Sequence, residues 1–265
     1  MEFIRIIAAS GAVLCGLMTL LWLLSLVLRD ASIVDSFWGA GFVITCWVYF
    51  LLTPAGATPR KWLLAVLVTV WGLRLSLHIL LRNWGRGEDF RYRAWREAAG
   101  RVWWWQSLFK VFWLQGALLW LISTPLLAAQ ISAAPARLIW LDWLALPIWA
   151  IGFLFEAGGD WQLQRFKAAA GNRGKLLTSG LWQYTRHPNY FGDALQWWGF
   201  YLMALAAGGW VTIVSPLLMT LLLVRVSGVA MLERSLHETK PDYREYMART
   251  SAFIPWFPRQ PRERG

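Results

Sequence analysis

A short polar stretch in an otherwise apolar chain is the first candidate for chemistry. In "TRHPNY", residues 185–190, Arg186 and His187 stand directly before Pro188. Proline suits the first position of a helix, because its missing N–H costs nothing there, and it biases the preceding residue towards extended backbone. The helix that follows therefore starts with backbone N–H groups that can bind an anion.

Polar residues continue along one face of this expected helix. Asn189, Asp193, Gln196 and Trp197 recur at helical spacing, so they share a face. Such groups are costly in lipid unless they are paired or face a wet cavity. We interpret the face as the wall of a binding site, and a purely structural polar network is the alternative.

The segment before this helix, "GDWQLQRFKAAAGNRGKLLTSG", is rich in basic residues and glycines. Glycines let the backbone approach a ligand closely, and clustered Arg and Lys suit a pyrophosphate or a ribose phosphate. Ordinary cytoplasmic loop charge is the alternative reading. The candidates in this segment and in an earlier loop are Asp160, Arg165, Lys167, Arg173, Lys175, Asn83 and Arg86.

A third polar set lies inside the expected span 62–82. Arg74, His78 and Arg82 follow at i, i+4 and i+8 and form one stripe, which cannot face lipid at mid-depth. The stripe is either the wall of a polar pocket or half of an interhelical ion pair, for which Asp35 is the candidate partner. We expect Asp35 near the non-cytoplasmic boundary, as a helix cap or as a buried acid facing the pocket.

The C-terminal segment offers Glu233 and His237, one helical turn apart. One His and one Glu without an HExxH pattern do not predict a metal site, so no metal is expected. The sequence contains neither G-x-G-x-x-G nor a Walker A motif, which leaves a soluble Rossmann or P-loop site unsupported.

The elements that must position these residues are membrane helices. The chain is 57% hydrophobic and contains 21 Trp, and it has repeated apolar runs of about 20 residues, the length that crosses a bilayer. We predict an all-α polytopic bundle of about seven transmembrane helices, forming a single domain over 1–265. The expected spans are 4–28, 32–52, 62–82, 108–130, 138–156, 190–207 and 210–230.

The net charge of +11 is explained by orientation. Most Lys and Arg fall in the loops after alternate spans, which places the N-terminus outside and the C-terminus in the cytoplasm of a bacterial inner membrane. The expected partner is therefore the lipid bilayer and not nucleic acid. The loops 83–107 and 157–189 are long enough to be functional. Trp103, Trp104 and Trp105 suggest an interfacial anchor or, alternatively, a stacking platform for a ring.

The stretches "SIVDSFWG", "LLTSGLWQYTRHPNYFGDALQWWGF" and "YREYMARTSAFIPWFP" resemble the membrane steroid 5-alpha-reductase superfamily, in its bacterial branch of unknown function. The "RHPNY" core is also similar to sterol C14 reductases and, in a close variant, to isoprenylcysteine methyltransferases. The resemblance implies NADPH in a cavity open to the cytoplasm and a lipophilic enone or alkene as substrate.

The resemblance also assigns roles to individual residues. The resemblance matches cofactor-contacting positions to Asn189, Tyr190, Asp193 and Trp197. It matches charged positions of the preceding loop to Asp160 and Lys167, and a loop that covers the cofactor to Asn83 and Arg86. Glu233 and His237 fall near the C-terminal positions that close over the cofactor in that superfamily. The residue chemistry above adds Arg165, Lys175, Arg186 and His187. Steroid reductases polarise the enone with a Glu and a Tyr from early spans, where this chain has Asp35 and Trp71. A protonated Asp35, helped by Arg74 or His78, is the expected catalytic group.

Three functions remain open. The first is a membrane reductase that transfers hydride from NADPH to an activated double bond of a lipid-like substrate. The alternative is a membrane methyltransferase using S-adenosylmethionine, which has no phosphate and leaves the basic loop residues less to bind. The third is a transporter or lipid-binding protein, against which the crowding of polar groups in one half of the bilayer argues. Neither the substrate nor the oligomeric state is predicted.

Overall fold

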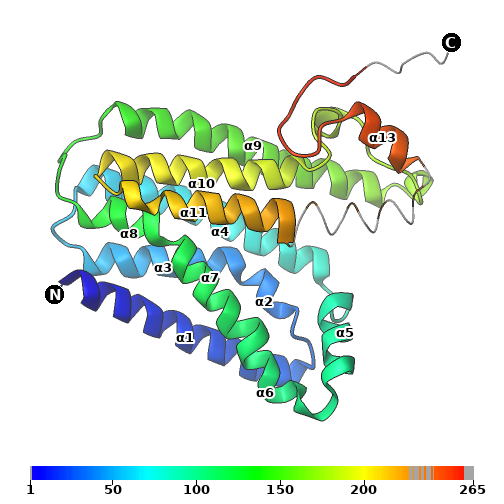
Figure 1. Ribbon diagram of the computed structural model, residues 1–265, viewed down its shortest axis with the longest axis horizontal. Helices are drawn as coiled ribbons and strands as arrows, with labels where there is room; N and C mark the ends of the chain where they lie inside the picture. Colours follow the sequence, from blue (N-terminus) through cyan, green and yellow to red (C-terminus); the bar gives the residue numbers. More distant parts are fainter. Residues whose placement is uncertain are drawn as a thin grey trace. The chain divides into compact units, whose positions relative to one another are not determined.

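The computed structural model describes residues 2–226, 229, 233, 236, 240 and 242–259. Its named elements are all helical, which confirms the predicted all-α class. The chain forms two compact units (Figure 1). Unit 1 consists of Met1–Ile139 and Met203–Thr212, and unit 2 consists of Trp140–Leu202 and Ile213–Gly265. The single domain expected over 1–265 stays a prediction.

Most of unit 1 is a run of helices broken by short turns. Its elements are α1 (Glu2–Leu28), α2 (Ile33–Ser36), α3 (Trp38–Leu52), α4 (Thr58–Asn83), α5 (Phe90–Ala99), the 3-10 turn η1 (Gly100–Val102), α6 (Trp103–Ser107), the π-helix η2 (Leu108–Trp113), α7 (Leu114–Ile122) and α8 (Thr124–Ile131). The 3-10 turn η5 (Trp210–Ile213) follows much later in the chain.

Unit 2 is built around two long helices, α9 (Trp140–Ala168) and α10 (Pro188–Ala206). The last residues of α10, from Met203 onward, belong to unit 1. Two 3-10 turns, η3 (Ala170–Asn172) and η4 (Gly180–Gln183), connect them. The unit continues with α11 (Val214–Leu221), the π-helix η6 (Leu222–Val226) and α13 (Tyr243–Arg249). Figure 1 shows α9 and α10 running side by side.

Apolar helices identify an integral membrane protein. Among the described residues, four helical stretches are long and apolar enough to span a membrane, and they are Phe3–Leu28, Thr58–Asn83, Phe90–Ile131 and Trp140–Ala168. Trp38–Leu52 and Trp210–Val226 are shorter apolar helices. The remaining expected span corresponds to α10, which has 19 residues and carries polar groups along one face.

Some helix boundaries differ from those expected from the apolar runs. The loop expected at 157–189 is partly helical, because α9 continues to Ala168. Its Gly159 does not end the helix; a Cβ there would lie 3.0 Å from Cγ of Pro188, so the glycine allows α10 to approach. The span expected at 32–52 is interrupted at Phe37, which separates α2 from α3.

A close contact between α3 and α4 forms the core of unit 1. A Cβ on Gly39 would lie 2.2 Å from the carbonyl oxygen of Gly72, so the two backbones touch. Phe42 and Trp71 are fully buried beside this contact, with ring centroids 5.6 Å apart. Trp71 is therefore a core residue of the α3–α4 pair.

Lys61 gives the first testable prediction, because it terminates a neighbouring helix. Its buried Nζ donates hydrogen bonds to the carbonyl oxygens of Phe50, at 2.8 Å, and Thr53, at 2.5 Å, at the end of α3. Those carbonyls have no partner within a helix. We expect Lys61→Met to lower the free energy of unfolding by about 1–3 kcal/mol, measured by denaturant unfolding in detergent. The matched control, Arg137→Met on an exposed loop, should leave it unchanged.

Candidate cofactor site

Glycines bring α9 and α10 into backbone contact. A Cβ on Gly192 would lie 2.3 Å from the carbonyl oxygen of Gly152, and one on Gly152 would lie 2.7 Å from that of Gly192. Gly159 makes a similar approach to Pro188 at the beginning of α10. Small residues permit such close packing of membrane helices, and here the packing leaves short polar side chains able to reach across the seam.

Two hydrogen bonds cross this seam, one of them buried and the other partly buried. Gln196 Nε2 donates to Glu156 Oε2 at 2.6 Å, and Asn189 Nδ2 donates to Asp160 Oδ1 at 3.0 Å. Glu156, Asp160 and Gln196 are buried, and Asn189 is half-buried. Asp193, which is also buried, lies one helical turn from Asn189 and one turn from Gln196. We call these five residues the α9–α10 polar cluster. Three carboxylates and two amides in a helix pair of a membrane protein indicate a functional site.

The cluster has an acceptor that the described residues do not satisfy. Gln196 is fully buried, its Nε2 donates to Glu156 and to the carbonyl of Gly192, and its Oε1 has no hydrogen-bond partner in the described part of the chain. An unsatisfied buried acceptor costs about 1–3 kcal/mol. Such an atom suits a ligand with N–H or O–H donors, as the ribose hydroxyls and the carboxamide of a nicotinamide nucleotide provide.

The basic residues that could hold phosphates lie at the end of α9 and in the loop after it. Arg165, Lys167, Arg173 and Lys175 are all exposed. This loop is fastened at several points: Asn172 Nδ2 donates to the carbonyl of Phe166 at 3.0 Å, and the Leu181 N–H donates to Gln162 Oε1 at 2.9 Å. Unit 2 therefore contains hydrogen-bond acceptors in the α9–α10 polar cluster and cations at and after the end of α9. A ligand with both hydroxyl groups and phosphates, such as NADPH, would use both kinds of group.

Arg186 is engaged within the protein. Its Nε donates to Glu233 Oε1 at 2.8 Å, and its Nη2 lies 2.6 Å from the same oxygen. Its Nη1 donates to the carbonyl oxygens of Met247, at 3.2 Å, and Thr250, at 2.5 Å. The guanidinium therefore joins the segment before α10 to α13 and to the residues that follow it.

His187 and Glu233 belong to the same group of contacts, and we call Arg186, His187 and Glu233 together the Arg186 anchor. His187 Nε2 lies 3.3 Å from Glu233 Oε1, and its ring stacks on Tyr190 with centroids 5.6 Å apart. Burial would raise the pKa of Glu233, but the hydrogen bonds from His187 and Arg186 and their charges outweigh it, so the pKa is lowered. His237, the other predicted residue of this region, lies outside the described residues.

The C-terminal segment pairs with the same stretch of chain. Thr185 and Ser251 form an isolated parallel bridge, and the Arg186 N–H donates to the Ser251 carbonyl at 2.9 Å. The Trp256 N–H donates to the Tyr184 carbonyl, also at 2.9 Å. The C-terminal segment is therefore folded back, and it covers the segment before α10 within unit 2.

Trp197 lies deeper in α10 than the polar cluster. It is fully buried, and its ring meets that of Phe200 edge-on at 5.5 Å. Tyr190 is half-buried near the start of the helix. Both residues interact with further groups of the protein, so the structure places Tyr190 beside the Arg186 anchor and Trp197 in the core.

Asp35 belongs to a polar network at one end of unit 1. Tyr92 Oη donates to Asp35 Oδ1 at 2.6 Å, Arg91 Nη2 donates to Oδ2 at 3.0 Å, and Gln115 Nε2 donates to Tyr92 Oη at 3.1 Å. Burial raises the pKa of Asp35, against the lowering by the Tyr92 hydrogen bond and the Arg91 charge. Asp35 thus forms an ion pair with Arg91, and an additional pairing with the Arg74 stripe stays a prediction.

One expectation for Asp35 is corrected by this network. The residue does not cap a helix, since Ser32 and Phe37 are the N-cap residues of α2 and α3. It lies against α5, within the region 83–107, and its expected position near the non-cytoplasmic boundary stays a prediction. The sequence interpretation considered Asp35 only within the expected span 32–52, and it did not consider that Arg91 and Tyr92 of α5 contact this residue.

The other predicted residues of unit 1 lie on and after α4. Arg74 and His78 are half-buried, and both interact with further groups of the protein. Asn83 ends α4, and its Oδ1 accepts a hydrogen bond from Arg82 Nε at 3.1 Å. Arg86 follows on an exposed turn.

Sequence reasoning missed Glu156, Arg91 and Tyr92. Glu156 is the single carboxylate in the apolar run 143–159, which is a signal in itself, because a buried acid in a membrane helix is rarely incidental. Arg91 and Tyr92 stand in a segment, "DFRYR", that looks like ordinary loop charge. Their role is visible only in the structure, where both side chains donate hydrogen bonds to Asp35.

Gly192 provides a direct test of the seam. We expect Gly192→Ala to destabilise the protein by about 1–3 kcal/mol, because the new Cβ meets backbone atoms that cannot move independently. Unfolding of the purified protein in detergent measures the effect. Gly158→Ala is the matched control, since its Cβ would meet only Leu181 Cδ1, at 3.1 Å, at the end of a flexible side chain. Equal stabilities for the two variants would contradict the close approach of α9 and α10.

The fold and the site define an all-α integral membrane protein with buried acceptors beside an exposed basic loop. The chain belongs to the family described as Protein of unknown function (DUF1295), whose model matches residues 21–250. It is 26% identical over 263 residues to an uncharacterized protein of Schizosaccharomyces pombe, covering 89% of this chain and 75% of that protein.

A second relative connects the family to the superfamily that the motifs resemble. The chain is 30% identical over 76 residues to 3-oxo-5-alpha-steroid 4-dehydrogenase 1 of Bos taurus, covering 26% of this chain and 30% of the enzyme. The similarity to steroid 5-alpha-reductases is therefore confirmed, over a short stretch. No solved structure matches the chain.

Proposed function

We propose that this protein is a membrane oxidoreductase that uses NADPH to reduce an activated carbon–carbon double bond in a lipid-soluble substrate. The observation that carries the proposal is the α9–α10 polar cluster, in which buried carboxylates stand with an acceptor, Gln196 Oε1, that no described residue satisfies. The similarity to a bovine steroid dehydrogenase supports the class of reaction.

In this proposal the residues of unit 2 bind the two halves of the cofactor. Asp160, Asn189, Asp193 and Gln196 accept hydrogen bonds from ribose hydroxyls and from the carboxamide, while Arg165, Lys167 and Lys175 bind phosphates. Bound NADPH supplies the hydride, and the chain contributes position and electrostatics. Arg186, His187 and Glu233 hold the beginning of α10 in place, with Tyr190 and Trp197 packed behind it. Asp35, Arg74, His78, Asn83, Arg86 and His237 stay predictions of the proposal.

Direct binding tests the proposal against the methyltransferase alternative. Purified protein in lipid nanodiscs is titrated with NADPH and, separately, with S-adenosylmethionine. We expect NADPH to bind at least about tenfold more tightly, and Lys167→Gln to weaken it while Arg137→Gln does not. Binding of S-adenosylmethionine without binding of NADPH would overturn the proposal in favour of methyl transfer.

A further inference from the structure

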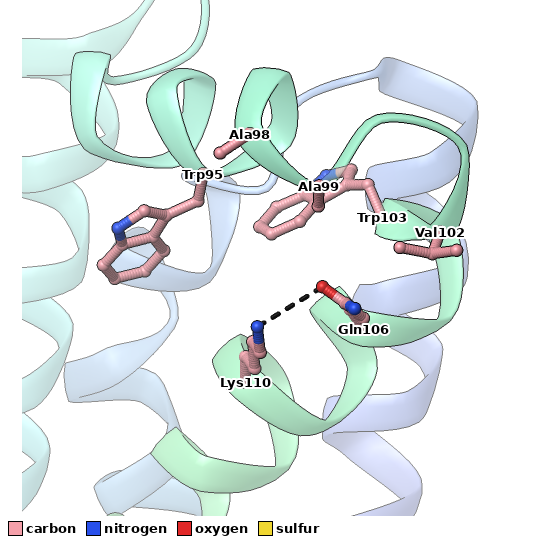
Figure 2. A pocket seen from close by; sticks show the side chains of 7 residues that line it. All are labelled: Trp95, Ala98, Ala99, Val102, Trp103, Gln106 and Lys110. Carbon is pink, nitrogen blue, oxygen red and sulfur yellow. Dashed lines mark hydrogen bonds between the residues drawn. The ribbon is translucent and has the colours of Figure 1, made fainter.

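A pocket lies in unit 1, at the bend between α5 and η2. Its volume is about 600 Å³, and its walls include Trp95 and Ala98 of α5, Trp103 and Gln106 of α6, and Lys110 of η2. Figure 2 shows the indole rings of Trp95 and Trp103 on the upper side of the pocket, with Gln106 and Lys110, joined by a hydrogen bond, on the lower side. We call it the elbow pocket.

The local backbone explains why the chain bends here. Gly100, with φ of 55°, ends α5 in the left-handed region that favours glycine. The chain then re-enters a helix at Trp103 and loosens into the π-helix η2, on which Lys110 lies. Single π turns in helices occur frequently at functional sites.

The chemistry of the elbow pocket is that of an amphiphile with an anionic end. Indole and alanine side chains form its apolar wall, and Lys110 is its cation. Lys110 Nζ donates to Gln106 Oε1 at 3.3 Å, and this is one of the three donors of an ammonium group. Gln106 and Lys110 are one turn apart, so the amide holds the lysine over the pocket. None of the described residues that line the pocket carries a carboxylate.

The surroundings of the elbow pocket indicate a position at the lipid headgroups. Trp104 and Trp105, beside the buried Trp103, are 58% and 43% exposed, and Trp95 is 52% exposed. Exposed Trp is enriched at membrane–water interfaces, and in the segment 93–101 the exposed Arg93 and Arg101 outnumber the exposed Glu97, which favours a negatively charged ligand there. The predicted interfacial role of Trp104 and Trp105 fits this position, whereas Trp103 turns inward.

We propose that the elbow pocket binds one glycerophospholipid with a net negative headgroup, such as phosphatidylglycerol. The headgroup phosphate contacts Lys110, and the glycerol and the first part of an acyl chain pack against Trp95 and Trp103. A lipid of zero net charge gains less, because its cationic group finds no carboxylate in the wall and is repelled by the basic residues around it.

Native mass spectrometry of the purified protein tests the proposal, with phosphatidylglycerol and phosphatidylcholine added in detergent. We expect Lys110→Gln to weaken phosphatidylglycerol binding about fivefold, as for one lysine at an anionic surface, and to leave phosphatidylcholine unchanged. Ala98→Glu, an exposed position in the wall, should have the same selective effect by repulsion. Arg137→Gln, which removes an exposed charge elsewhere, is the matched control.

Two results would overturn the proposal. One is equal phosphatidylglycerol binding by Lys110→Gln, Ala98→Glu and Arg137→Gln. The other is displacement of the lipid by glycerol phosphate at the same concentration, since a site for a small anion would not need the aromatic wall. Unfolding midpoints of the variants establish that each one is folded when it is compared.

Discussion

Asp193→Asn should weaken NADPH binding by about 30- to 100-fold, the largest effect we expect on the cofactor. Asp193 is buried on α10, one turn from Asn189 and from Gln196 with its unsatisfied oxygen. The substitution keeps the size of the side chain but turns one acceptor oxygen into a donor. A ribose hydroxyl or a carboxamide then meets a donor, and a hydrogen bond to a charged group worth about 1.5–3 kcal/mol is lost.

A second buried aspartate in the same unit provides the control. Asp142 is fully buried in the first turn of α9, and the 18 positions to Asp160 correspond to about 27 Å of helix. Asp142→Asn changes the same group and should leave the NADPH dissociation constant unchanged in a fluorescence titration. If the two variants bind NADPH equally well, Asp193 does not contact the cofactor.

Arg186→Met should release the C-terminal segment and lower the free energy of unfolding by about 3 kcal/mol. The substitution removes the guanidinium from Glu233, which keeps its contact with His187, and deprives the carbonyls of Met247 and Thr250 of their donor. Arg186→Lys should recover less than half of the loss, because one ammonium group cannot reproduce contacts made by three guanidinium nitrogens. Proteolysis of residues 242–259 and unfolding in detergent measure the effect.

Arg249 provides a control that compares the Arg186 anchor with an exposed ion pair on the surface. Arg249 pairs with Glu245 on the surface of α13, and an exposed pair of this kind contributes about 0.5 kcal/mol. Arg249→Met should therefore have little effect. An Arg186→Met protein as stable and as protease-resistant as Arg249→Met would contradict the assigned role of Arg186.

Protonation of Glu233 at low pH should also weaken the Arg186 anchor and release the C-terminal segment. The pKa of Glu233 is lowered from its ordinary value of 4.5. A carboxyl with a lowered pKa stabilises the folded state fully above the unfolded-state value and loses that contribution as the pH falls through the folded-state value. The C-terminal segment should become protease-sensitive below about pH 4.5, and Glu233→Gln should remove this pH dependence.

The sequence predicted those features that depend on local patterns. Apolar runs identified the membrane helices, and the proline of "TRHPNY" marked the first residue of α10, Pro188. The face carrying Asn189, Asp193 and Gln196 followed from helical periodicity alone. These features need no knowledge of which segments meet, because length, spacing and proline geometry determine them.

Partners distant in the chain could not be predicted in the same way. Arg186 meets Glu233 after 47 residues, and Asp35 meets Arg91 after 56. Periodicity tells which face of a helix is polar, but not which segment packs against that face. For this reason the sequence analysis did not single out Glu156, which α10 brings into contact with Gln196, nor Gly159, whose missing side chain allows the beginning of α10 to approach α9.

The most direct test of the central proposal follows the hydride itself. Purified protein is incubated with a lipid extract and with NADPH deuterated at the transferable position of the nicotinamide, and lipid products are compared by mass spectrometry with and without protein. We predict a product that gains two hydrogens, one of them the deuterium bound to carbon, and that is absent with Asp193→Asn. Consumption of NADPH with no deuterium in any lipid, or products methylated by added S-adenosylmethionine, would contradict the account.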